Sequence, residues 1–308
     1  MKMAFIARYA RDLRGFHTPG CRKSAPPLWD IFEQKMQGAA GSVGGRAARR
    51  LDRLAAAALL VLVLAVAGCG GAPDAPPRAT PDRLSDADPT RWRGTNPATL
   101  PVQGVDLSRF QGAVDWPKVK AAGLEFAWLK ATEGGDRVDP AFEGNWRGAK
   151  RAGLARGAYH FYYHCRPANE QAAWFIANAP RESGALPPVL DIEWTPDSPT
   201  CTIRPDAAVV RAGIEAFQRI VAAHYGQRPV IYTTVDFWRD NDLGRLRGEE
   251  FWLRSVAAQP GAIYPGQRWT FWQFSATGLV PGVVGLTDRN AFNGSASAWQ
   301  SWLATRQQ

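Results

Sequence analysis

Apolar residues from position 102 onward follow two alternating patterns: short runs typical of buried strands, and longer stretches with helical spacing. The predicted strands are 104–108, 125–131, 156–163, 186–193 and 229–233, and the predicted helices between them are 117–123, 140–153, 170–178 and 205–225. Beyond residue 233 the helical signal fades, and three more strands are predicted at 251–256, 270–275 and 283–288. Repeated strand–helix units indicate a parallel sheet with right-handed crossovers. Eight strands in ~200 residues therefore predict an α/β fold, a closed TIM-like barrel that is irregular in its last third.

The strand at 186–193, with the sequence LPPVLDIE, carries two acids on one face. Side chains at i and i+2 of a strand point the same way, so Asp191 and Glu193 lie together. Crowding raises the pKa of one of the two carboxyl groups. A proton-holding acid beside an ionised carboxylate is what cleavage of a glycosidic bond requires. The alternative is a pair of ordinary surface acids at a strand end.

Two further acids are expected at the same rim of the barrel. Asp106 ends the first predicted strand and Asp288 ends the eighth. Chemistry in such barrels sits at the C-terminal ends of the strands, and the first and last strands are neighbours once the barrel closes. The sequence therefore predicts that four carboxylates distant along the chain, Asp106, Asp191, Glu193 and Asp288, meet at one mouth.

The positive charge of the chain is unevenly distributed. The formal net charge is +9, but residues 101–308 hold 22 Lys+Arg and 20 Asp+Glu, so the predicted barrel is close to neutral. With no basic cluster on its elements, we expect no nucleic-acid partner. The 13 Trp residues of the chain fit either core packing or a sugar-binding cleft, and their number does not separate the two.

The N-terminal third has the pattern of an export signal. Leu54–Ala67 is an unbroken run of Leu, Ala and Val, preceded by four arginines and followed by Gly68-Cys69. As a helix the run spans about 21 Å, short of a roughly 30 Å bilayer core. The cysteine after small residues resembles a bacterial lipoprotein box, which implies cleavage before Cys69 and lipidation of its thiol; a plain signal peptide or a short anchor is the alternative. We therefore divide the chain into a leader and signal peptide (1–68), a lipidated Cys69 with a flexible tether (69–100) and a barrel (101–308).

Five motifs in the barrel occur in the order found in glycoside hydrolase family 25, the Chalaropsis-type lysozymes. The sequence resembles this family over about residues 102–294, at Asp106-Leu-Ser-Arg-Phe-Gln-Gly112 with Asp115-Trp116, at Lys130-Ala-Thr-Glu-Gly134, at Gly157-Ala-Tyr-His-Phe161, at Asp191-Ile-Glu193, and at Trp272-Gln-Phe-Ser275 followed by Asp288. Each motif alone is weak, but five in order at predicted strand ends are strong.

The resemblance implies a (β/α)5(β)3 barrel and N-acetylmuramidase activity, which cleaves the β-1,4 bond between N-acetylmuramic acid and N-acetylglucosamine in peptidoglycan. Glu193 stands at the family's acid/base position. Asp191 would stabilise charge at the anomeric carbon or orient the substrate's 2-acetamido group. The sequence leaves open whether the nucleophile is Asp191 or the acetamido oxygen of the substrate. Asp106 and Asp288 fall at the family's other acidic positions. The residues expected to bind substrate are Tyr159, Lys130, Tyr232, Trp272 and Gln273.

Several of these residues also have structural interpretations. We expect Lys130 to be paired electrostatically with Asp106 or Glu133. His160 faces away from Tyr159 and is expected to be a hydrogen-bonded structural histidine. Cys165 and Cys201 both follow strand ends at the same rim, so an oxidising compartment would allow them to form a disulfide. No His/Cys cluster has zinc spacing, and we predict no metal and no cofactor.

The function predicted from the sequence is an exported, membrane-tethered and monomeric muramidase that acts on peptidoglycan glycan strands and faces the periplasm or the exterior. The alternatives are a non-catalytic glycan-binding lipoprotein, and a hydrolase of another 2-acetamido polysaccharide such as chitin.

Overall fold

The computed structural model describes residues 94–256 and 258–308. The predicted signal peptide, Cys69 and residues 70–93 of the predicted tether lie outside this part of the chain. None of the helices within it combines the length and the apolar character that crossing a membrane requires.

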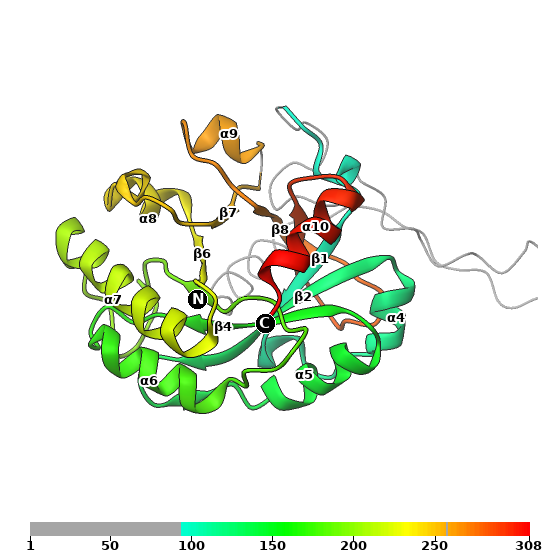
Figure 1. Ribbon diagram of the computed structural model, residues 1–308, viewed down its shortest axis with the longest axis horizontal. Helices are drawn as coiled ribbons and strands as arrows, with labels where there is room; N and C mark the ends of the chain where they lie inside the picture. Colours follow the sequence, from blue (N-terminus) through cyan, green and yellow to red (C-terminus); the bar gives the residue numbers. More distant parts are fainter. Residues whose placement is uncertain (1–93, 257) are drawn as a thin grey trace, which may run out of the picture. The chain divides into compact units, whose positions relative to one another are not determined.

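The elements follow the predicted strand–helix alternation (Figure 1). The strands are β1 (Gln103–Leu107), β2 (Leu124–Glu133), β3 (Arg137–Val138), β4 (Ala155–Phe161), β5 (Val189–Asp191), β6 (Val230–Thr233), β7 (Phe251–Arg254), β8 (Phe271–Gly278) and β9 (Thr287–Phe292). The helices are α4 (Trp116–Ala121), α5 (Phe142–Arg151), α6 (Ala168–Asn178), α7 (Ala207–Tyr225), α8 (Val235–Asp240), α9 (Pro260–Ile263) and α10 (Ala296–Arg306), with short 3-10 turns η4 (Pro97–Thr99), η5 (Arg109–Gln111) and η6 (Leu243–Arg245).

Eight of the strands form a closed barrel. The sheet order is β1-β9-β8-β7-β6-β5-β4-β2-β3, and an additional β1–β2 pairing closes the ring, which leaves β3 as a short hairpin extension of β2. Helices α4 to α8 follow the first five barrel strands, while β7, β8 and β9 follow one another with only the four-residue α9 between them. The predicted irregular (β/α)5(β)3 barrel is therefore confirmed.

Alternating side chains separate an inner core from an outer one. Inward-facing aromatic rings, among them Trp128 and Trp252, stack in the barrel interior with ring centroids 5.8 Å apart. Outward-facing aliphatic residues pack against α4 to α7, the layer along the lower side of Figure 1. Gly157 makes room inside, because a Cβ there would lie 2.0 Å from the ring of Trp128.

The last strand runs in the direction opposite to the one expected. β9 is antiparallel to both β1 and β8, whereas the prediction that Asp288 ends the last strand at the same rim as Asp106 required a strand parallel to β1. Asp288 is therefore the second residue of β9 and does not end its strand. The N-terminal end of an antiparallel strand lies at the rim where its neighbours have their C-terminal ends, so Asp288 still lies at the mouth, directly opposite Asp106.

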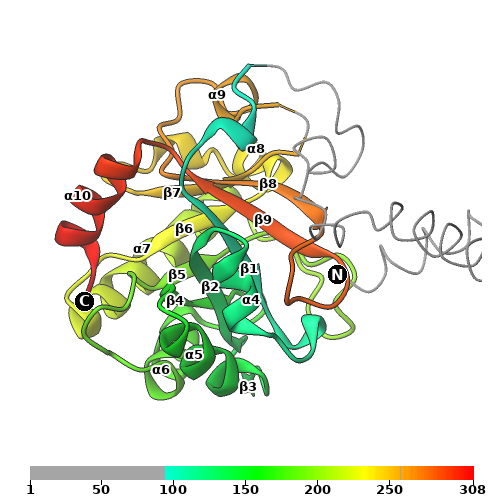
Figure 2. The ribbon, with the colours of Figure 1, turned by 90° about the vertical axis from the view of Figure 1, so that its right-hand side faces the viewer.

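The folded domain begins before residue 101, where the tether was expected to end. Asn96 caps η4 by accepting a hydrogen bond from Ala98 N at 2.9 Å, and Pro97 is buried. Ala98 and Leu100 pack against an apolar cluster on β8 and β9 that includes Trp272. Figure 2 shows this segment crossing the two strands on its way to β1.

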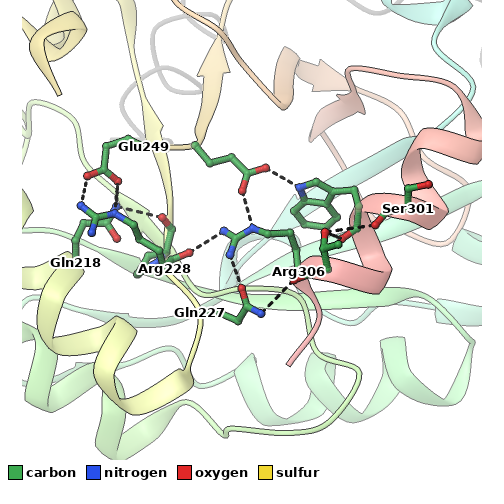
Figure 3. Close-up of polar contacts among 10 residues, drawn as sticks. Gln218, Gln227, Arg228, Glu249, Ser301 and Arg306 are labelled. Atoms are coloured by element: carbon green, nitrogen blue, oxygen red, sulfur yellow. Dashed lines mark hydrogen bonds and ion pairs between the residues drawn. The ribbon is translucent and has the colours of Figure 1, made fainter. Parts of the chain in front are cut away.

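Helix α10 is bound at the end of the barrel opposite to the mouth, where β6 and β7 begin (Figure 3). Arg306 forms an ion pair with Glu250 at 2.9 Å, and the indole of Trp302 donates to the same carboxylate at 2.6 Å. Arg306 also donates to the backbone of Arg228 at 2.8 Å. Trp299 lies 3% exposed against the innermost aromatic rings, so α10 closes this end of the barrel.

Candidate active site

Asp106 lies at the centre of a hydrogen-bond network at the mouth of the barrel. Its Oδ2 accepts from Gln273 Nε2 at 2.8 Å and from Asn290 Nδ2 at 2.9 Å. Gln273 in turn accepts from the Tyr232 hydroxyl at 2.8 Å, and Asn290 accepts from the indole of Trp252 at 2.8 Å. These side chains come from five strands, so closure of the barrel brings the network together.

The two acids that follow β5 face the same interior. Ile192 packs into the outer core, and its amide extends the ladder by donating to Tyr232 O at 3.0 Å, so Asp191 and Glu193 on either side of it point inward. Burial raises the pKa of the Tyr232 hydroxyl well above its ordinary value, and the negative charges of Glu193, Asp191 and Asp106 raise it further, against the positive charge of Arg254. Asp191 also pairs in register with Tyr232 across β5 and β6, which places it beside Tyr232 at the mouth.

Local turns fix where the acid-bearing strands end. Immediately after β1, Ser108 and Gln111 form a capping box around η5, in which Ser108 N donates to Gln111 Oε1 at 3.0 Å. At the end of β2 itself, Lys130 forms an ion pair with Glu133, the last residue of the strand, at 2.6 Å, and the Tyr163 hydroxyl donates to Glu133 at 2.5 Å. Burial of Glu133 would raise the pKa of its carboxyl, but the charge of Lys130 and the bonds from Lys130 and Tyr163 outweigh burial and lower the pKa. The expected electrostatic pairing of Lys130 is confirmed, with Glu133 as its partner.

Comparison with known proteins identifies the family. The model of glycosyl hydrolases family 25 matches residues 105–283. The chain belongs to glycosyl hydrolase family 25. It is 40% identical over 210 residues to lysozyme M1 of Streptomyces globisporus, covering 65% of this chain and 70% of the relative. It is 33% identical over 186 residues to the N,O-diacetylmuramidase of Chalaropsis sp, covering 56% of this chain and 88% of the relative.

Solved structures agree with this family. The lysozyme of Streptomyces coelicolor superposes with a TM-score of 0.60 at 37% identity, covering 67% of this chain and 99% of that one. Together with the family match, this makes the chain a glycoside hydrolase with the barrel of the family-25 lysozymes.

Some of the residues predicted to bind substrate lie inside the barrel, but Trp272 does not. Tyr232 and Gln273 belong to the network around Asp106, and Tyr159 lies inside the barrel at 4% exposure. Trp272 does not line a cleft, which corrects the prediction. Its ring is fully buried on the outer face of β8, because it neighbours the inward-facing Gln273, and its indole donates to Ser255 O at 2.6 Å.

Three residues at this family-25 site were missed by the sequence analysis: Trp252, Arg254 and Asn290. Trp252 and Arg254 are two residues apart and therefore share the inner face of β7. Arg254 pairs in register with Gln273. Asn290 lies two residues beyond Asp288 on the same face of β9. The signal that could have found Asn290 is this spacing, which was lost because the predicted strand stopped at Asp288.

Cysteine and histidine positions agree with their structural interpretations. Cys165 and Cys201 form the expected disulfide, with Cα atoms 5.7 Å apart, and they lie in the segments that follow β4 and β5. His160 is fully buried, and its ring nitrogens lie 2.7 Å from Thr132 Oγ1 and 3.2 Å from Gln171 Oε1. Burial lowers the pKa of His160 to about 3. In residues 94–256 and 258–308, no group of three or more His, Cys, Asp and Glu side chains is placed to hold a metal ion.

Proposed function

We propose that this family-25 enzyme is a peptidoglycan hydrolase, a lysozyme that cleaves the β-1,4 bond between N-acetylmuramic acid and N-acetylglucosamine. The observation that carries the proposal is the mouth of a family-25-type barrel, where Asp106 and Asp288 lie opposite each other on β1 and β9 and Asp191 ends β5. Relatives named as a lysozyme and as an N,O-diacetylmuramidase support the substrate class.

In this proposal Glu193 is the acid/base. It donates its proton to the glycosidic oxygen as the bond to the anomeric carbon breaks, and then removes a proton from the water that attacks this carbon. Asp191 stabilises the positive charge that develops on the sugar ring. Asp106 and Asp288 form the opposite side of the mouth, where the amides of Gln273 and Asn290 fix the orientation of Asp106.

The test is Glu193→Gln, which keeps the shape of the side chain but has no proton to give. We expect kcat on purified peptidoglycan to fall by roughly 10²–10⁴-fold, the contribution typical of a general acid/base. Glu143→Gln, on the exposed side of α5, is the matched control and should retain wild-type kcat. Equal rates for Glu193→Gln and wild type would remove Glu193 from the mechanism.

Mass analysis of the released fragments distinguishes the proposal from its rivals. A muramidase leaves N-acetylmuramic acid at the new reducing end, whereas a glycan-binding protein without turnover releases nothing. Release from chitin oligosaccharides at a rate equal to or above the rate on peptidoglycan would assign the enzyme to another 2-acetamido polysaccharide.

We further propose that the enzyme is exported and acts as a monomer tethered to a membrane by lipid on Cys69. The apolar run Leu54–Ala67, with a cysteine two residues after it, supports this membrane location. Growth with a radiolabelled fatty acid should label the wild-type protein and leave Cys69→Ala unlabelled and outside the membrane fraction. Equal labelling of the two would refute the anchor, and sedimentation of the detergent-purified protein as a dimer would refute the monomer.

A further inference from the structure

The backbone that carries Glu193 lies beyond the sheet. β5 ends at Asp191, and the ladder to β6 extends only to the amide of Ile192. Residues 193–205 contain no helix or strand. An acid/base must hold its position to within about 0.5 Å. Contacts other than the barrel ladder must therefore fix Glu193.

His164 provides one of these contacts. Its Nε2 lies 3.2 Å from the carbonyl oxygen of Glu193, and because a carbonyl only accepts, Nε2 carries the hydrogen. The imidazole packs against the rings of Trp194 and Phe237, with centroids 5.2 Å from each, and these two rings also contact one another at 4.7 Å. Burial in this stack lowers the pKa of His164. The ring is therefore a neutral donor held in one orientation.

The next residue along the chain provides a second contact. Cys165 is joined to Cys201, and Cys165 N also donates to Cys201 Sγ at 3.0 Å. The Thr195 hydroxyl donates to Cys201 O at 2.6 Å, which ties the start of the segment 195–201 to its end. The consecutive residues His164 and Cys165 thus hold the backbone on both sides of Trp194. We call His164, Cys165, Thr195 and Cys201 the clasp.

We infer that the clasp positions Glu193 for proton transfer, with His164 as a positioning residue that acts through the Glu193 backbone. The inference rests on the proposed function of Glu193 as acid/base. The clasp acts on kcat and leaves glycan binding unchanged, because its four residues hold the backbone behind the carboxyl group. Misplacement of a reacting group by about 1 Å can cost roughly 10²-fold in rate.

Two substitutions of His164 in the full-length protein separate its donor from its ring. His164→Phe keeps the stack and removes the donor; His164→Gln removes the ring but places an amide N–H near the position of Nε2. We expect His164→Phe to lower kcat by roughly 10-fold or more with KM within about twofold, and His164→Gln to recover most of kcat. His160→Phe is the matched control. It removes a buried histidine of the same strand region that does not contact the Glu193 segment, so it should lower Tm and leave kcat unchanged below the melting range.

The disulfide is tested by replacing both cysteines with serine, alone and combined with His164→Phe. We expect the double cysteine variant to lose kcat as His164→Phe does, and the combined loss to be smaller than the product of the separate losses, because both contacts hold one backbone segment. These variants also decide the question if His164→Phe fails to fold.

Different experimental results would refute the clasp and the proposed function of Glu193. Wild type without turnover, or Glu193→Gln with wild-type turnover, would refute the proposed function. Active wild type, inactive Glu193→Gln, and wild-type kcat in both the His164→Phe and the cysteine variants would refute the clasp alone. A kcat loss in His160→Phe equal to that in His164→Phe would also refute it, by showing that general loosening of the fold explains both.

Discussion

Two histidines four residues apart have different structural roles because their surroundings differ. His164 reaches the backbone of the proposed acid, whereas His160 is enclosed between the sheet and α7, where its ring stacks on Phe217 with centroids 5.2 Å apart. Both are held neutral by burial, and this has a consequence for the response of the protein to acid.

We predict that stability falls as pH drops below about 6.5, in part because of His160. Its pKa is about 3 in the folded chain against an ordinary value of 6.5, so the unfolded chain binds the extra proton first. The stabilising contribution is complete above 6.5 and is lost as pH falls toward 3. Urea unfolding at about pH 7 and about pH 5 should show a smaller loss for His160→Gln than for wild type, and equal losses would contradict the prediction.

The same neighbourhood shows how far single residues could be predicted. The inward-facing pair Asp191 and Glu193 followed from strand alternation alone. Trp272 was misplaced because its neighbour Gln273 takes the inward position of β8, and an adjacent residue must face the other way. Alternation separates the two faces of a strand, but it does not say which face is the interior when both carry large apolar residues.

At the scale of elements, the barrel strands and the α-helices before residue 233 were predicted to within a few residues, but the two-residue β3 and the direction of β9 were not. The signal was present in the length of the connection. Only eight residues, 279–286, separate β8 from β9, whereas a parallel crossover needs about a dozen or more. α8 was missed because six residues, Val235–Asp240, are too few to show a helical repeat.

Helix α10 gives the prediction that belongs to this scale. Arg306→Met should lower the free energy of unfolding by about 1–3 kcal/mol, because it leaves the Glu250 carboxylate, 20% exposed, without its cationic partner. Arg245→Met is the control, since Arg245 and Asp242 are 72% and 58% exposed, and it should change stability by no more than about 0.5 kcal/mol. Denaturant unfolding measures both, and equal effects would mean that the ion pair does not contribute to holding α10.

At the scale of the whole molecule, the barrel and its acidic mouth could be predicted, but the hydrogen bonds within the mouth could not. Sequence order places Asp106 near Asp288 once a closed barrel is assumed, because the first and last strands must meet. The choice of Gln273 and Asn290 as partners of Asp106 depends on the strand register, which the apolar pattern does not define.

The pairing of β1 with β9 also determines when the enzyme becomes active. Asp106 and Asn290 are 184 residues apart in the sequence. Because the chain is synthesised from its N-terminus, Asp106 is made long before β9, the strand that closes the barrel. Contacts of such long range form slowly, and domains fold as units. A nascent polypeptide that still lacks β9 therefore cannot cut glycan, and lytic activity begins only after the final strand has been synthesised and has paired with β1.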